Sequence, residues 1–191
     1  IGVSFDGLGW GADDLLWGGE VLVVHDYTSY DRAAHLEPVP QPGGDAAARE
    51  TPRMAFAYLH AALGDDAIAL CREWFPEQAD QFPLLAQMIT RGVNSPRTTS
   101  MGRLFDAAAA LLGICRYNTF HAQAPMELEA QAHLAADEEE AYKAAIVPDD
   151  NGILIIKSTA IIRAIVEDVR NNTSAPVCAA RFHNAIAHAT L

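Results

Sequence analysis

The segment EPVPQPGGD at residues 37–45 sets the organisation of the chain. Three prolines alternate with other residues and two glycines follow, so this segment is an extended connector that cannot continue a helix or a central strand. Before it, apolar and β-branched runs separated by Gly, Asp and Ser predict a β-rich head over residues 1–36. After it, apolar residues recur at 3–4 spacing, which predicts a mostly helical body over residues 45–191. By its length the chain forms one domain or two small ones.

The bulk properties exclude several classes of protein. The net charge is −12, and the 13 basic residues are scattered among 25 acids, so no nucleic-acid partner is expected. No apolar run approaches the roughly 20 residues of a membrane-spanning helix, and the first residues do not form a signal peptide, so we expect a cytoplasmic protein without a membrane partner. The start at Ile1, inside a strand-like run, suggests a piece of a longer protein.

The cysteines and the acidic run are expected to have structural roles only. Cys71, Cys115 and Cys178 are far apart and odd in number, which fits neither a zinc site nor a disulfide framework, so buried free thiols are expected. The run of four acids at residues 137–140 is typical of a solvated helix face.

The first twenty residues contain the pattern that most suggests a ligand site. An apolar run, IGVSF, leads directly to Asp6, which is followed by Gly7, Gly9 and Gly11. Glycines let a ligand approach the main chain, so a carboxylate in such a loop suits a metal ion or a phosphate group. The alternative interpretation is a long, twisted hairpin loop.

Residues 101–115 are predicted to form a helix with two different faces. One face carries large apolar side chains and belongs to the core, whereas the other consists of small residues around a single acid, Asp106. Such a face is either packed tightly against another element, with Asp106 bonded to neighbouring backbone, or it forms the floor of a ligand site. In the second case Asp106 would reach a hydroxyl or a sugar, with Arg103 nearby.

Taken in order, six short segments resemble the carbamoyltransferase HypF family, which acts in the maturation of nickel–iron hydrogenases. The segments are FDGLGWG, WGGE, PGGDAAARE, NSPRTTSMGRLFDAAAALLG, QAPMELE and ARFHN. The resemblance implies part of an actin-like (ASKHA, Kae1-like) α/β fold. In this family a carbamoyl-adenylate, made from carbamoyl phosphate and ATP, passes its carbamoyl group to the C-terminal cysteine of the partner HypE, on the way to the cyanide ligands of the hydrogenase iron.

The resemblance also implies roles for individual residues. Asp6 would bind a divalent metal, iron or zinc, beside a histidine pair that lies before this segment in the family. Glu127 or Glu129 would lie near the ribose. The remaining residues expected on the nucleotide side of the cleft are Gly18, Gly19, Glu20, Gly102, Arg103 and Asp106.

Departures from the family pattern define the open questions. The family usually has glycine where Asp14 and Ala122 stand, so two turns are expected to differ here. Because the zinc fingers and the adenylate-forming domain of the family are absent from these residues, we expect the 191-residue chain alone to be inactive. Two alternatives remain, namely an O-carbamoyltransferase of the same fold that acts on a small molecule, and a truncated module that is not catalytic.

Overall fold

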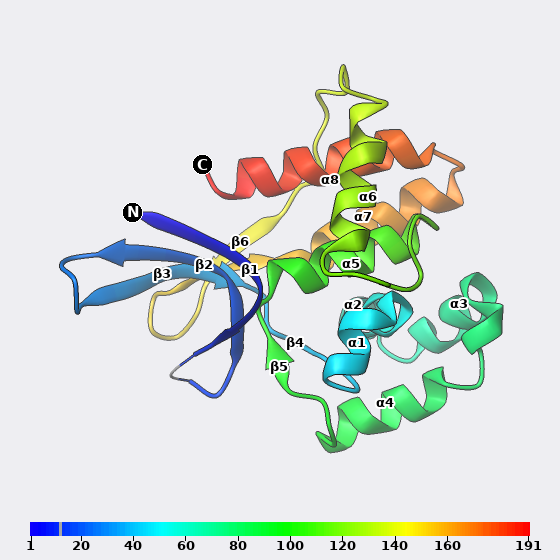
Figure 1. The fold of residues 1–191 in the computed structure, drawn as a ribbon, viewed down its shortest axis with the longest axis horizontal. Coiled ribbons are helices and arrows are strands. Elements are labelled where there is room, and N and C mark those ends of the chain that lie inside the picture. The colour runs from blue at the N-terminus through cyan, green and yellow to red at the C-terminus, as the bar shows by residue number, and fades with distance from the viewer. Residues whose placement is uncertain (12) are drawn as a thin grey trace.

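A mixed β-sheet lies on one side of the molecule and the helices pack on the other side (Figure 1). The computed structural model describes residues 1–11 and 13–191. The strands in this part of the chain are β1 Gly2–Trp10, β2 Leu16–Val24, β3 Tyr30–Leu36, β4 Val39–Pro40, β5 Arg97–Thr98, β6 Ala145–Pro148 and β7 Leu154–Lys157. The helices are α1 Asp45–Arg49, α2 Thr51–Leu63, α3 Asp66–Trp74, the 3-10 helix η1 Pro76–Gln78, α4 Phe82–Arg91, α5 Met101–Leu111, α6 Gln123–His133, α7 Ser158–Arg170 and α8 Ala175–Ala189.

The sheet takes strands from both sides of the proline-rich connector. Its strand order is β4-β5-β2-β3-β7-β6. Strand β1 is not in this row, and it pairs only with β2. The first three strands form antiparallel ladders, whereas β3 pairs with β7 and β2 pairs with β5 in parallel. The α/β fold class is therefore correct. The apolar segment ILII, residues 153–156, contributes to strand β7, which lies between β3 and β6 in the sheet, although it belongs to the part of the chain that was predicted to be mostly helical.

The core lies mainly among the helices, with α2, α5 and α7 in mutual contact, and the strands add Leu36, Val39 and Ile156 to it. Most residues of α2 are buried, and α5 contributes an unbroken run of buried residues from Asp106 to Leu111. All three cysteines are buried and free, as predicted. Because alanines fill the middle of α5, its neighbours α2 and α6 approach it closely.

Helix α5 begins and ends for local reasons. Ser100 is its N-cap, and its hydroxyl accepts a hydrogen bond from the N–H of Arg103 at 3.2 Å. The helix was expected to run to Cys115, but it ends at Leu111. The chain reverses at Gly113, whose φ is +70°, and the N–H of Ile114 donates back to the carbonyl of Ala109.

Candidate functional site

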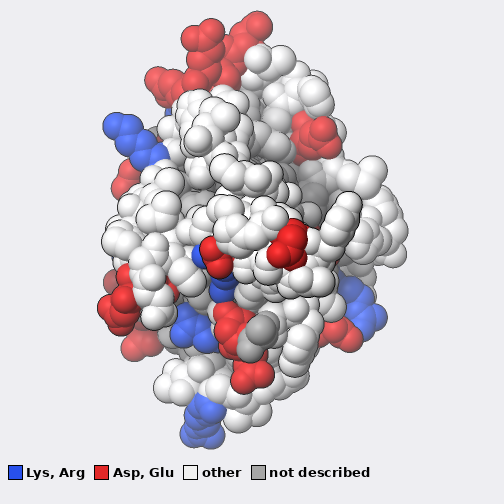
Figure 2. Space-filling view, turned by 90° about the vertical axis from the view of Figure 1, so that its left-hand side faces the viewer, with Lys and Arg blue, Asp and Glu red and all other residues white. Residues whose placement is uncertain are grey.

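Asp6 lies on β1 where the strand leaves its partner. The pairing of β1 with β2 is regular up to Phe5 and resumes with a shifted register at Gly9, so Asp6 is in the irregular stretch between them. Its side chain is exposed, and Oδ1 accepts a hydrogen bond from the N–H of Gly7 at 2.6 Å. The side of the molecule toward which the strands extend in Figure 1 carries scattered acidic and basic side chains among many uncharged ones (Figure 2). The carboxylate of Asp6 is thus accessible to a ligand.

The N-terminus of α5 packs directly against Asp6 and Gly7. The hydroxyl of Ser100 lies 2.8 Å from the Asp6 carbonyl oxygen and 2.9 Å from the Gly7 carbonyl oxygen. A Cβ atom added to Gly102 would lie 2.9 Å from the Cα of Gly7, so no side chain fits there. The small-residue face of α5 is therefore used, at Gly102, for tight packing against a strand.

The segment Gly18–Glu20 is buried, and its polar groups find their partners within the protein. A Cβ at Gly18 would lie 2.5 Å from the carbonyl oxygen of Asp6, so this glycine serves the approach of two strands. The N–H groups of Gly18 and Gly19 both lie 3.3 Å from Oε1 of Glu20. Glu20 is 2% exposed and also pairs with Arg32, whose Nε lies 2.6 Å from Oε2. These residues support the sheet next to the irregular stretch of β1 that contains Asp6.

Asp106 is fully buried and carries a close ion pair. Its Oδ2 lies 2.8 Å from Nη2 of Arg103, and its Oδ1 accepts a hydrogen bond from Nδ2 of Asn118 at 3.0 Å. Burial raises the pKa of Asp106 to about 6, against the opposing effects of Arg103, Asn118 and His121. The expected bond from Asp106 to neighbouring backbone is replaced by bonds to two side chains.

A cavity of about 310 Å³ opens beside Arg103. It lies between α1, α5 and the segment that precedes α6. Its lining residues are Ala48, Arg49, Arg103, Asn118, Thr119, Phe120, His121 and Ala122. Two arginines and a histidine line it without any acid, although the whole chain has a net charge of −12. Such a local excess of positive charge favours an anionic ligand.

The irregular stretch of β1 at Asp6 and this cavity are neighbours. A Cβ placed on Gly7 would lie 3.8 Å from Nη2 of Arg103, so the arginine lies between this stretch of β1 and the cavity. The structure thus brings Asp6, Gly102, Arg103 and Asp106 together, as the sequence interpretation requires for one site.

The two glutamates predicted near the ribose lie further along α6 and do not line this cavity. Glu127 is half-buried, and its Oε1 accepts a hydrogen bond from Nε2 of Gln123 at 2.7 Å. Glu129 is exposed and lies 3.9 Å from Nε2 of His133. The part of α6 that reaches the cavity is its N-cap, Ala122.

Both positions where the family usually has glycine adopt left-handed backbone. Asp14 has φ +59° and Ala122 has φ +60°. A residue with a Cβ is unfavourable in this region, whereas glycine is not. The two turns therefore keep the conformation that suits glycine in spite of the substitutions.

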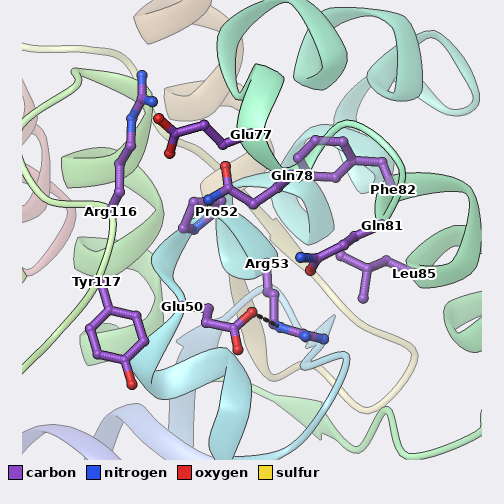
Figure 3. Close-up of a pocket in the computed structure, with 10 residues that line it drawn as sticks. All are labelled: Glu50, Pro52, Arg53, Glu77, Gln78, Gln81, Phe82, Leu85, Arg116 and Tyr117. Carbon is purple, nitrogen blue, oxygen red and sulfur yellow. Dashed lines mark hydrogen bonds and ion pairs between the residues drawn. The ribbon is translucent and has the colours of Figure 1, made fainter.

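A second cavity, of about 350 Å³, contains none of the predicted site residues (Figure 3). The first turn of α2, the start of α4 and Arg116 surround it, and Glu50 and Arg53 form an ion pair at 2.7 Å within it. Its lining has acids and bases in equal number, so it lacks the one-sided charge of the cavity beside Arg103.

Sequence reasoning missed three residues of the basic cavity, namely Arg49, Asn118 and His121. Arg49 ends the short helix α1, and the other two lie in an irregular segment between α5 and α6. Arg49 stands in the segment PGGDAAARE, which contributed to the family resemblance but gave this residue no role. For Asn118 and His121 the only available signal was their location in a polar loop that follows a helix with an acid on its small-residue face.

Metal ligands are sparse in the part of the chain that the structure describes. In residues 1–11 and 13–191, no three His, Cys, Asp or Glu side chains are grouped so that they could hold an ion. Asp6 therefore offers one carboxylate, which suits iron or zinc as a single ligand but does not make a complete site. The same residues contain no helix with the length and apolar character needed to cross a membrane.

Comparison with known proteins gives consistent results. The family model described as "Carbamoyltransferase, Kae1-like Domain, second subdomain" matches residues 2–191. A carbamoyltransferase HypF homolog of Cupriavidus necator is 38% identical over 99% of this chain and 48% of its own length. The carbamoyltransferase HypF2 of the same organism is 45% identical over 69% of this chain and 16% of its own length.

Solved structures show the same fold. The crystal structure of full-length HypF in the phosphate- and nucleotide-bound form superposes with a TM-score of 0.87 and 33% identity, covering 98% of this chain and 24% of that one. The predicted Kae1-like fold is therefore confirmed. The chain spans less than half the length of each of these three relatives.

Proposed function

The chain belongs to the carbamoyltransferase HypF family, and from this premise we propose that it forms part of the cleft in which a carbamoyl group leaves a carbamoyl-adenylate. The donor is made from carbamoyl phosphate and ATP, and the acceptor is the C-terminal cysteine of HypE. Support comes from the family match over residues 2–191 and from a solved relative described as phosphate- and nucleotide-bound.

The observation that carries this proposal is the basic cavity next to Asp6 on strand β1. Arg49, Arg103 and His121 line it, and no acid does. Guanidinium groups bind phosphate oxygens with charge-assisted hydrogen bonds, so the phosphate of an adenylate is the expected occupant of this side of the cleft. Asp106 lies beneath Arg103 and neutralises part of its charge, which keeps the guanidinium oriented.

In the transfer step the thiolate of HypE attacks the carbamoyl carbon. A C–S bond forms while the C–O bond to the adenylate phosphate breaks, AMP leaves with the electron pair, and the thiol proton passes to solvent. The residues of this chain bind the departing phosphate through Arg103 and Arg49, and they hold it close to Asp6. Negative charge that develops on the phosphate is thereby stabilised in place.

Asp6 is proposed as one ligand of a divalent iron or zinc ion. Such an ion, when bound, would act as a Lewis acid at the carbamoyl centre. The Asp6 side chain is exposed, so an ion can reach it. The hydrogen bond from the N–H of Gly7 to its Oδ1 restricts the orientation of the carboxylate. Further ligands would come from residues outside this chain.

The test compares Asp6→Asn with Asp150→Asn in the intact protein. Both replace an exposed aspartate, but Asp150 lies in the turn between β6 and β7. We expect Asp6→Asn to reduce carbamoyl transfer to HypE to background while carbamoyl phosphate-dependent adenylate formation continues. Asp150→Asn should change neither rate. Normal transfer by Asp6→Asn would refute the assignment of Asp6.

The nucleotide part of the proposal has its own test. Arg49→Gln should weaken the binding of AMP, the nucleotide part of the adenylate, about tenfold, the value of one charge-assisted hydrogen bond. Arg91→Gln, which removes an exposed arginine at the end of α4, should leave the affinity unchanged. Equal affinities of Arg49→Gln and the unaltered protein would show that the basic cavity does not bind the phosphates.

A further inference from the structure

Asn118 occupies a buried position where three elements meet behind the basic cavity. It is 8% exposed, and it lies between α5 and α6. Its main-chain N–H donates to the carbonyl of Arg49 at 2.8 Å, which joins this segment to the end of α1. One residue thus connects the loop that lines the cavity to the helix that carries Arg49.

The Asn118 side chain uses both of its polar atoms. Nδ2 donates to the carbonyl of Ala48 at 2.9 Å and to Oδ1 of Asp106 at 3.0 Å, while Oδ1 accepts from the N–H of Ala124 at 2.8 Å. Two of these three partners are backbone groups that fix the side chain in place. The third partner is a carboxylate, and a bond to backbone would have served a purely structural role equally well.

The bond to Asp106 determines how Arg103 is held. Asn118 occupies Oδ1 of the carboxylate, so Oδ2 is directed to Nη2 of Arg103 at 2.8 Å. The Arg103 side chain is 12% exposed, and its contact with Asp106 is an ion pair rather than an aligned hydrogen bond, since Nε of Arg103 and Oδ2 of Asp106 are both buried without a hydrogen-bond partner among the described residues. Asp106 is therefore the side chain that orients the guanidinium at the cavity wall.

We propose that Asn118 is a positioning residue, which fixes the Asp106 carboxylate and through it holds the Arg103 guanidinium at the wall of the basic cavity. The expected loss of nucleotide affinity when Asn118 is replaced rests on the function proposed above. The expected change in the pKa of Asp106 does not rest on it, and this pKa is measured separately.

The groups that face Asp106 come from several elements. Arg103 lies on the same helix, Cys115, Asn118 and His121 lie on the segment between α5 and α6, and Tyr58 lies on α2. Arg103, Asn118 and His121 each favour the ionised carboxylate. Loss of the Asn118 donor should therefore raise the pKa of Asp106 further above its value of about 6.

The first measurement follows the titration of the Asp106 carboxyl carbon by NMR in the protein that contains this chain. Asn118→Ala should raise the midpoint by about one pH unit, the usual effect of one hydrogen bond to a carboxylate. Asn118→Asp provides a second variant that retains an acceptor for the N–H of Ala124, and the added negative charge should raise the midpoint further. An unchanged midpoint in both variants would overturn the proposal.

The matched control is Asn184→Ala. Nδ2 of Asn184 donates to the carbonyls of Glu138 and Glu140, both at 2.9 Å, so it also fixes a loop with two backbone bonds, but it lies on α8. It should lower stability without moving the Asp106 midpoint. If Asn184→Ala moves the midpoint as far as Asn118→Ala does, the shift reports general loosening and the proposal fails.

The second measurement is the affinity for AMP in a double-mutant cycle. Asn118→Ala should weaken binding about tenfold on its own and add little in an Arg103→Gln background, because both changes remove the same oriented guanidinium. Full additivity would refute positioning through Arg103. A protein that does not bind AMP, but in which the Asp106 midpoint still moves, would refute the proposed function and support the positioning role.

Discussion

Replacement of Ala122 by glycine should stabilise the protein. Ala122 is the N-cap of α6 and has φ +60° and ψ +23°, a left-handed conformation. A Cβ in this region costs about 1–2 kcal/mol. Glycine avoids that cost, but it also gives the unfolded chain more conformational freedom, which lowers the free energy of unfolding by about 0.4–1 kcal/mol. The net gain in the free energy of unfolding is therefore about 0.5–1 kcal/mol.

The prediction is tested by thermal and urea denaturation of two variants, Ala122→Gly and the control Ala130→Gly, each compared with the unaltered protein. Ala130 is an exposed residue in the middle of the same helix, where glycine costs about 1 kcal/mol relative to alanine. For a chain of this size, 1 kcal/mol corresponds to about 2–4 °C in Tm. The same substitution should thus raise Tm at position 122 and lower it at position 130. A fall in Tm for both variants would refute the strain argument.

Three further predictions concern the surroundings of the site. Gly102→Ala should lower the free energy of unfolding by about 1–3 kcal/mol, because its Cβ would meet the backbone of β1, whereas Gly2→Ala, with no atom within 4 Å, should be neutral in urea denaturation. Thr99→Val removes the hydroxyl that donates to buried Glu20 and should cost about 1–3 kcal/mol in the same assay; a neutral result would show that this bond contributes nothing. Finally, the folded pKa of Asp106 (about 6) lies above the unfolded value of 3.8, so its contribution to stability is full below pH 4 and is lost as pH rises to 6. That loss, about 2–3 kcal/mol, should disappear in Asp106→Asn, and parallel pH–stability curves for the two proteins would contradict it.

Local patterns in the sequence predicted the elements that local chemistry determines. The strands of residues 1–36 have alternating apolar residues and turn signals, and α5 has a hydroxyl cap and an apolar stripe. The sheet partners were not predictable in the same way. β5 has two residues and β7 has four, so neither carries enough pattern to identify its neighbour.

The site was predicted only where an unusual residue stood out. Asp106 was noticeable because a lone acid lay on a face of small residues, and Asp6 because glycines follow it. Gly18 illustrates the limit, since a bare backbone position looks the same in a sequence whether a ligand or the protein's own carbonyl group approaches it. Asn118 lacked any signal, because its role depends on three partners that only the folded chain brings together.

The parallel pairing of β3 with β7 has a consequence for the order of folding. Leu36 pairs with Ile156, about 120 residues later in the chain, so this edge of β3 stays open until most of the chain has been synthesised. Contacts between such distant residues form slowly, and an open strand edge invites pairing with other chains. During synthesis, β3 is therefore the segment where we expect a chaperone to be most needed and where a stalled or shortened chain should aggregate.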